Sequence, residues 1–158
     1  MILFFLIPLI LLIIAAINFV QIRTPKATSQ LLDSVGVVVP MRNEAQNVEG
    51  IVTTLSAQDS AFHYYLLDDN SEDSTYELLQ KLTASDSRFT VIKGAPLANG
   101  WIGKTWALQQ LYEASNEDVL VSIDADVRLT NDAINKAVTV LHGARLDFVS
   151  PYPRQIAQ

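Results

Sequence analysis

Short apolar segments alternate with segments of helical spacing along this chain, and this alternation limits the fold more than any other feature of the sequence. Val35–Val39 is a β-branched run of strand length, and apolar side chains recur at helical spacing across residues 45–57. Further strand-like runs stand at residues 64–67, 89–92 and 119–123. Strands that alternate with helices form βαβ units, so we expect an α/β fold with a mostly parallel sheet flanked by helices.

Three further elements complete the expected order. Ser74 and Glu77 make a capping-box pattern, which predicts a helix over residues 74–83. A second helix is expected over about residues 131–142, and residues 147–150 are expected to begin a fifth strand.

Polar clusters follow three of the predicted strands, at the points where the strands end. They occupy residues 42–44, 68–70 and 124–126. Because the carboxyl ends of parallel strands meet at one edge of a sheet, we expect these clusters to converge on a single site.

The pattern Asp124-Ala-Asp126 is the most informative of these clusters. Two carboxylates two residues apart at a strand end can both reach one divalent cation if the backbone turns there, and Mg²⁺ and Mn²⁺ prefer such oxygen ligands. In isolation the same pattern is common in turns, where Asp bonds to the local backbone. Its position after an apolar strand, beside a second acidic pair, favours the metal site.

Asp68 and Asp69 allow two interpretations. One carboxylate could accept a hydrogen bond from a base N–H or a ribose hydroxyl, because adjacent like charges at a buried strand end are costly unless a ligand compensates them. Alternatively, the cluster is a turn in which Ser71 or Asp73 caps the following helix.

Lys104 ends a glycine-containing loop, residues 100–104, that precedes a predicted helix. A cation at a helix N-terminus is unfavourable by itself because that end favours anions, so the lysine points to a phosphate ligand. Its spacing alone supports a solvated lysine equally well.

Composition and missing motifs argue against several classes of function. The chain has no cysteine, which excludes a disulfide framework, a thiolate metal site and a thiol nucleophile. A net charge of −6 argues against nucleic acid as a partner. The sequence has no Gly-x-Gly-x-x-Gly, no complete Gly-x-x-x-x-Gly-Lys-Ser/Thr phosphate loop and no Gly-x-Ser-x-Gly motif, which weakens dinucleotide-binding, NTPase and serine-hydrolase interpretations.

The first 22 residues carry no charge, whereas all 11 basic and 17 acidic residues lie behind them. About 20 apolar residues cross a bilayer as a helix, so residues 1–22 are predicted to form an uncleaved, single-pass transmembrane anchor. Arg23 and Lys26 follow the apolar run and favour the cytoplasmic side of the cell membrane for the remainder. A buried core helix is the alternative. Residues 23–34 are predicted as a linker and residues 35–158 as the globular domain.

Four blocks of the sequence resemble glycosyltransferase family 2, whose GT-A fold is a Rossmann-like sheet for nucleotide-diphospho-sugars. The order and spacing of the first, second and fourth blocks are specific to that family. The third, with an N-terminal membrane helix, looks most like the branch that glycosylates carotenoid or related lipid acceptors. The blocks are Val37-Val-Val-Pro-Met-Arg-Asn-Glu44, Leu67-Asp-Asp-Asn-Ser-Glu-Asp-Ser-Thr75, Gly100-Trp-Ile-Gly-Lys104 and Ile123-Asp-Ala-Asp126.

The resemblance implies transfer of a sugar from a nucleotide-sugar, in the first place a UDP-sugar, with Mg²⁺ or Mn²⁺ as cofactor. It implies that Asp124 and Asp126 bind the metal and that Asp69, with Asp68 beside it, contacts the base or ribose. The complete nucleotide-binding set that it implies is Pro40, Arg42, Asn43, Glu44, Asp68, Asp69, Lys104 and Asp124.

The catalytic base of inverting relatives is an acidic residue in a second half of the domain, after the metal motif. Behind Asp126 this chain offers only Asp132 and Asp147, which are expected to open a helix and a strand. The base therefore has no candidate here, and the chain is expected to be the donor-binding half of a longer, membrane-anchored enzyme.

Two other classes of function stay open. A phosphatase of the haloacid dehalogenase type also uses Asp-x-Asp after a strand, with the first Asp as nucleophile, but usually on its first strand, whereas Asp124 follows the fourth. A non-catalytic module that kept the nucleotide fold would share the binding residues and differ only in turnover.

Overall fold

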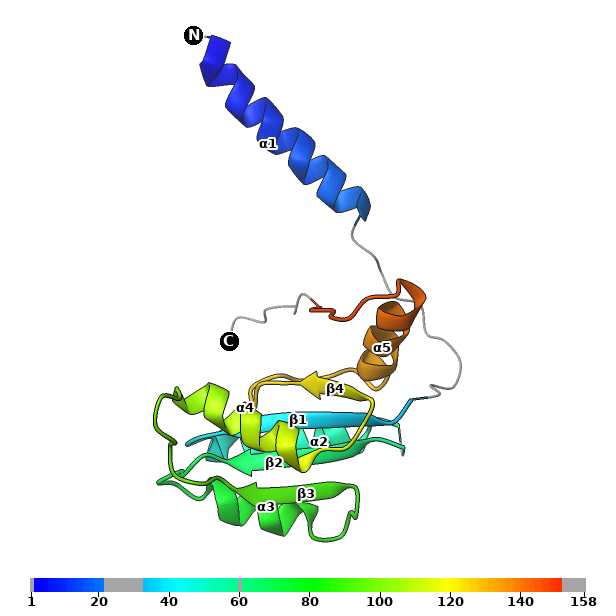
Figure 1. The fold of residues 1–158 in the computed structure, drawn as a ribbon. Coiled ribbons are helices and arrows are strands. Elements are labelled where there is room, and N and C mark those ends of the chain that lie inside the picture. The colour runs from blue at the N-terminus through cyan, green and yellow to red at the C-terminus, as the bar shows by residue number, and fades with distance from the viewer. Residues whose placement is uncertain (1, 22–32, 60, 152–158) are drawn as a thin grey trace.

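The computed structural model describes residues 2–21, 33–59 and 61–151, and its ordered domain is built on a parallel sheet (Figure 1). All three strand pairings are parallel, and the strand order is β3-β2-β1-β4. The α/β class predicted from the alternation is therefore confirmed. The strands are β1 (Val35–Met41), β2 (His63–Asp68), β3 (Phe89–Lys93) and β4 (Val119–Ser122).

Helices cover both faces of the sheet (Figure 1). The larger core lies between the sheet and α2, α3 and α5, and the smaller core lies between the sheet and α4. This three-layer arrangement is the one that βαβ units produce. The helices are α1 (Ile2–Gln21), α2 (Ala45–Ser56), α3 (Thr75–Thr83), α4 (Gly103–Ala114) and α5 (Ala133–Gly143).

Strand β1 is central and is buried on both faces. Val37 and Val39 pack into the larger core, whereas Val38 packs into the smaller one beneath α4. Burial on both faces explains why the strand is a continuous apolar run without polar alternation.

The strand β1 also extends two residues beyond the predicted end at Val39. Pro40 and Met41 still pair with β2, opposite Leu67 and Asp68. Proline is tolerated here because β4 pairs with β1 only as far as Val38, so no neighbouring strand needs the missing N–H of Pro40.

One local prediction is confirmed in part and another is wrong. The helix predicted over residues 74–83 is α3 with Ser74 as its N-cap residue, but the Ser74 side chain makes no capping bond. Asp73 accepts the Thr75 N–H at 2.9 Å. Residues 147–150 form no strand; Phe148 is 79% exposed, so this segment lacks the partner strand and the cover that an apolar strand needs.

The N-terminal helix α1 stands apart from the α/β domain in Figure 1, and its described side chains, from Leu6 onward, are exposed. Within the residues that the structure describes, no helix combines the length and hydropathy that a membrane span requires, so the span predicted for residues 1–22 is not supported. The linker predicted at residues 23–34 lies outside the described residues except for Asp33 and Ser34.

Candidate active site

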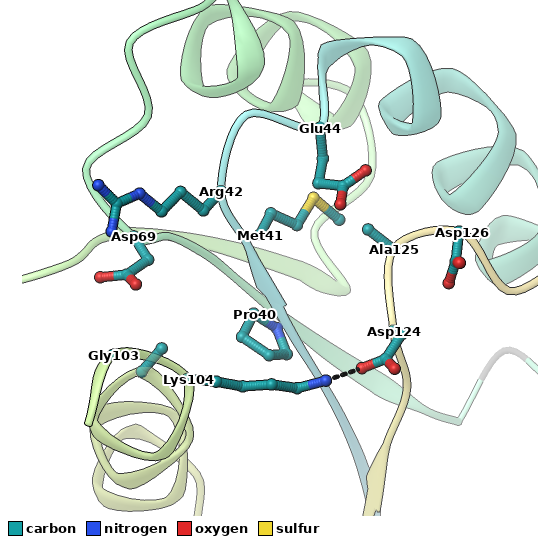
Figure 2. A pocket seen from close by; sticks show the side chains of 11 residues that line it. Pro40, Met41, Arg42, Glu44, Asp69, Gly103, Lys104, Asp124, Ala125 and Asp126 are labelled. Carbon is teal, nitrogen blue, oxygen red and sulfur yellow. Dashed lines mark hydrogen bonds and ion pairs between the residues drawn. The ribbon is translucent and has the colours of Figure 1, made fainter. Parts of the chain in front are cut away.

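A cavity of about 340 Å³ opens at the carboxyl edge of the sheet (Figure 2). Its walls come from the end of β1 and the turn after it, the end of β2, the start of α4 and the turn after β4. The polar clusters predicted to converge do meet here. The lining residues are Pro40, Met41, Arg42, Glu44, Asp69, Gly103, Lys104, Ala107, Asp124, Ala125 and Asp126.

The turn after β4 presents two carboxylates to this cavity. Ala125 is 4% exposed and packs into the larger core, whereas Asp124 and Asp126 on either side of it are exposed. The Val127 N–H donates to the Asp124 carbonyl at 3.1 Å, which closes the turn. Burial of the small residue between them therefore sets both carboxylates at the cavity wall (Figure 2).

Opposite this turn lies the N-terminus of α4. Its N-cap residue, Ile102, offers no side-chain bond to the first turn, so free backbone N–H groups and the positive end of the helix dipole face the cavity beside Gly103. Lys104 adds a cation, and its Nζ lies 2.6 Å from Asp124 Oδ1 (Figure 2). The loop before α4 is fixed by Trp106, whose indole N–H donates to the Pro96 carbonyl at 3.1 Å.

The two adjacent aspartates at the end of β2 have different surroundings. Asp69 lines the cavity, whereas Asp68 is 1% exposed, is absent from the lining, and leaves Oδ1 without a hydrogen-bond partner. Gly94 packs closely behind them, since a Cβ at that position would lie 2.9 Å from the Asp68 carbonyl oxygen. Of the two, only Asp69 is placed to contact a ligand in the cavity.

The loop after β1 is held by the loop after β2. Asn43 has φ 54°, a left-handed conformation that asparagine tolerates, and its Oδ1 accepts the Glu72 N–H at 2.8 Å. The Ser71 hydroxyl accepts the Asn43 N–H at 2.9 Å. Asn43 therefore does not line the cavity; it shapes the turn that carries Arg42 and Glu44 there.

Asp73 and Thr75 make further hydrogen bonds between the loop after β1 and the loop after β2. The predicted nucleotide-binding set does not contain these two residues. The Thr75 hydroxyl accepts the Glu44 N–H at 2.9 Å, and Asp73 Oδ2 accepts the Ala45 N–H at 3.1 Å. The hydrogen bond from the Thr75 hydroxyl holds the pKa of Asp73 below its ordinary value. Only the spacing Asp-x-Thr at a helix start hints at such a role in the sequence.

Four carboxylates and two cationic side chains line the cavity, so its formal balance is negative. Figure 2 shows Arg42 and Asp69 at one side and Asp124 and Asp126 at the other. A polyanion would be repelled by this set unless a cation accompanied it. The carboxylates offer the oxygen ligands that Mg²⁺ and Mn²⁺ prefer, and the α4 N-terminus offers donors to an anion.

Fold and cavity together define an α/β protein with a polar cavity, lined by carboxylates and cationic side chains, at the carboxyl edge of its sheet. A sequence model of glycosyl transferase family 2 matches residues 36–156. The chain therefore belongs to glycosyl transferase family 2.

Two curated relatives are enzymes named for glycosyl transfer. The chain is 29% identical over 113 residues to 4,4'-diaponeurosporenoate glycosyltransferase of Staphylococcus haemolyticus, a match that covers 72% of this chain and 29% of that protein. It is 29% identical over 108 residues to undecaprenyl-phosphate 4-deoxy-4-formamido-L-arabinose transferase of Pseudomonas fluorescens, covering 66% and 31%. The matches thus span under a third of each relative.

Solved structures share the fold. The mannosyltransferase PcManGT of Pyrobaculum calidifontis, solved with GDP-Man and Mn²⁺, matches with a TM-score of 0.67 at 21% identity over 84% of this chain and 39% of that one. Glucosyl-3-phosphoglycerate synthase of Mycobacterium tuberculosis, solved with Mn²⁺, UDP and phosphoglyceric acid, matches with a TM-score of 0.54 at 23% identity over 73% and 40%. The predicted GT-A-like fold is confirmed.

Proposed function

We propose that this chain binds a nucleotide-diphospho-sugar together with a divalent cation and serves as the donor-binding part of a glycosyltransferase. The observation that supports this most directly is the cavity itself, where the carboxylates of Asp124 and Asp126 face Lys104 and the open N-terminus of α4. One wall is suited to a cation and the other to phosphate oxygens. Relatives solved with Mn²⁺ and GDP-Man or UDP are consistent with the same ligand class.

Asp124 and Asp126 are the residues that would hold Mg²⁺ or Mn²⁺. The part of the chain that the structure describes contains no group of three or more His, Cys, Asp or Glu side chains arranged to hold a metal ion. Two carboxylates on one turn fit a cation that completes its shell with diphosphate oxygens and water. When bound, such a cation stabilises the negative charge that grows on the leaving diphosphate.

The remaining lining residues are proposed to bind the nucleotide, a UDP-sugar in the first place. Asp69 would accept a hydrogen bond from the base or ribose, and Arg42 beside it adds a cation at the same side of the cavity (Figure 2). Lys104 would leave Asp124 for a phosphate oxygen, because the cation then neutralises the aspartate.

Neither of the two acidic residues that follow Asp126, Asp132 and Asp147, lies in the cavity lining, so we assign no base for the acceptor hydroxyl. Asp132 is paired with Lys136 at 2.6 Å and lies outside the cavity, and Asp147 is exposed on the segment after α5.

We propose a lipid acceptor, since the names of similar enzymes include undecaprenyl-phosphate and diacylglycerol.

We propose further that residues 1–22 attach the domain to the cytoplasmic face of the cell membrane. The support is the uncharged apolar run, the exposed side chains of α1 and the basic Arg23 and Lys26 behind it. Carbonate extraction tests this: the chain should stay with the membrane fraction, and release into the supernatant would refute the attachment.

Calorimetry on the complete chain with UDP and Mn²⁺ tests the proposed function. UDP should bind only when Mn²⁺ is present, and Asp126→Ala should abolish binding while the fold persists by circular dichroism. Binding without a cation, or binding unchanged in the variant, would refute the proposal. Release of UDP from a UDP-sugar would separate an enzyme from a non-catalytic binding module.

A further inference from the structure

Arg128, two residues after the second aspartate of the β4 turn, lies outside the cavity lining yet contacts the turn directly. Its Nη1 donates to the carbonyl of Ala125 at 2.9 Å and to that of Val127 at the same distance. One guanidinium group thus bonds to the peptide between Ala125 and Asp126 and to the carbonyl of Val127, the residue after Asp126. A planar guanidinium with several fixed donors is suited to such multiple backbone contacts.

The same guanidinium also reaches helix α2. Its Nη2 donates to Asn47 Oδ1 at 2.9 Å, and Asn47 Nδ2 donates to Glu44 Oε2 at 2.7 Å. Glu44 lines the cavity. A continuous chain of hydrogen bonds therefore joins the turn with the aspartates to a carboxylate on the opposite loop.

Gly50 makes room for this contact. A Cβ at Gly50 would overlap the Nε and Nη2 atoms of Arg128, so the guanidinium lies against the bare backbone of α2. Glycine in a helix interior is less stable than alanine, and the close approach of Arg128 is a physical reason for glycine at this position.

We propose that Arg128 is a positioning residue that fixes the separation and direction of the Asp124 and Asp126 carboxylates for the divalent cation, by locking their turn to α2 over Gly50. The proposal rests on the proposed function, since it concerns the same cation. Arg128 itself lies outside the cavity lining and would act on the cation through its bond to the Ala125 carbonyl.

The structure offers a matched control. Gln58, on the segment just after α2, also ties the chain behind the turn to this helix region, donating from Nε2 to the Thr130 carbonyl at 2.9 Å. Gln58→Leu removes that tie at similar volume, further from the aspartates. A merely structural role for Arg128 would make the two variants behave alike.

The experiment compares the full-length wild type with Arg128→Met, Gly50→Ala, the double variant and Gln58→Leu. Mn²⁺ affinity is measured by electron paramagnetic resonance, with and without UDP. The backbone exchange of residues 124–128 is measured in ligand-free protein. Arg128→Met should weaken Mn²⁺ binding about 10-fold, as loss of an outer-shell partner does, and speed exchange of the Val127 amide. Gln58→Leu should lower thermal stability and leave Mn²⁺ affinity within about 2-fold of wild type.

Gly50→Ala supplies the sharper signature. It should weaken Mn²⁺ binding like Arg128→Met, yet in the Arg128→Met background it should cause no further loss and should raise thermal stability, because alanine favours the helix. Additive losses of Mn²⁺ affinity in the double variant, or wild-type affinity and exchange in Arg128→Met, would overturn the role of Arg128. Absence of Mn²⁺ binding by the wild type, even with faster exchange in the variant, would refute the proposed function and the metal role together.

Discussion

The two edges of the sheet use acidic side chains in opposite ways. At the carboxyl edge, Asp69 and Asp126 make no side-chain hydrogen bond or ion pair within the described part of the chain, and both line the cavity. Asp124 has a partner, Lys104, but this pair is more than half exposed. These carboxylates are left available to a ligand.

At the amino edge the acidic side chains are fully engaged. Glu117 Oε1 lies 2.8 Å from His63 Nδ1 and accepts the Tyr65 hydroxyl at 2.9 Å, with only 6% of its side chain exposed. Asp118 Oδ2 accepts both the Ser34 hydroxyl at 2.8 Å and the Ser34 N–H at 3.1 Å. These bonds join segments far apart in the sequence.

The contrast separates carboxylates that stabilise the fold from carboxylates that are available to a ligand. A carboxylate whose bonds are satisfied inside the protein contributes to the free energy of folding, whereas one left unpaired among like charges costs stability until a ligand arrives. Substitutions at the carboxyl edge should therefore change ligand affinity, whereas substitutions at the amino edge should change the stability of the fold.

The largest difference is expected between Asp126→Ala and Asp118→Ala. Loss of a metal ligand should weaken Mn²⁺-dependent UDP binding by more than the roughly 10- to 100-fold that loss of an outer-shell partner costs. Asp126→Ala should leave thermal stability unchanged or slightly higher, because no internal bond is lost. Asp118→Ala should show the reverse: lower stability and UDP affinity like wild type, measured by calorimetry and thermal denaturation. A loss of UDP affinity in Asp118→Ala would break the contrast.

Removing Glu117 should have the next largest effect. Glu117→Ala leaves the Tyr65 hydroxyl and His63 without their partner, and we expect a loss of about 1–3 kcal/mol in the free energy of unfolding by urea. Glu117→Gln keeps the volume and an acceptor for Tyr65 and should lose less. UDP affinity of the folded protein should not change; a larger effect on affinity than on stability would place Glu117 in the binding machinery.

Lys104→Met should weaken the binding of UDP with Mn²⁺ but not the binding of Mn²⁺ alone. Without the lysine, UDP with Mn²⁺ should bind about 10-fold more weakly, because one charge-assisted phosphate bond is lost. Mn²⁺ alone should bind as well as or better than in wild type, because Asp124 is released from its 2.6 Å ion pair. Titration of Mn²⁺ with and without UDP measures both, and weaker binding of Mn²⁺ alone would contradict the displacement of Lys104.

The smallest effect is a pH dependence at Asp73. Its pKa is lowered by the Thr75 hydroxyl, so its contribution to stability is present above the ordinary aspartate pKa and disappears as pH falls through the lower folded-state value. Asp73→Asn should therefore lose less stability than wild type on acidification from about pH 6 to about pH 3. Urea midpoints across this range measure the difference; equal slopes would show that Asp73 is not the titrating group.

The sequence sufficed for the sheet and for the place of the site, because both follow from local patterns. The buried run of β1 and the polar residues after three strands could be recognised without knowing what they contact. The different surroundings of Asp68 and Asp69 could not, since the two are adjacent identical residues after the same apolar run, and only the folded chain buries Asp68 and leaves Asp69 at the cavity.

The supporting bonds of the site could not be predicted for a different reason. Thr75 and Asp73 act on a loop about 30 positions earlier, and Arg128 bonds to Asn47 across 81 positions. Ordinary turn residues acquire these roles only when the sheet brings their loops together. The capping bond expected from the Ser74 side chain is also absent, although Ser74 does precede α3 as its N-cap residue.

The strand order has a consequence for how the chain folds as it is made. Strand β1 needs β4 as its second neighbour, and their joining bond between Ser34 and Asp118 spans 84 positions. At a synthesis rate of about 5–20 residues per second, about 4 to 17 s separate the synthesis of β1 from that of β4. During this interval the edge of β1 that later pairs with β4 has unpaired backbone groups, which can pair with a wrong strand. A chaperone that covers such an edge would act in this interval. The turn at Asp124 is also the last part of the cavity lining to be synthesised.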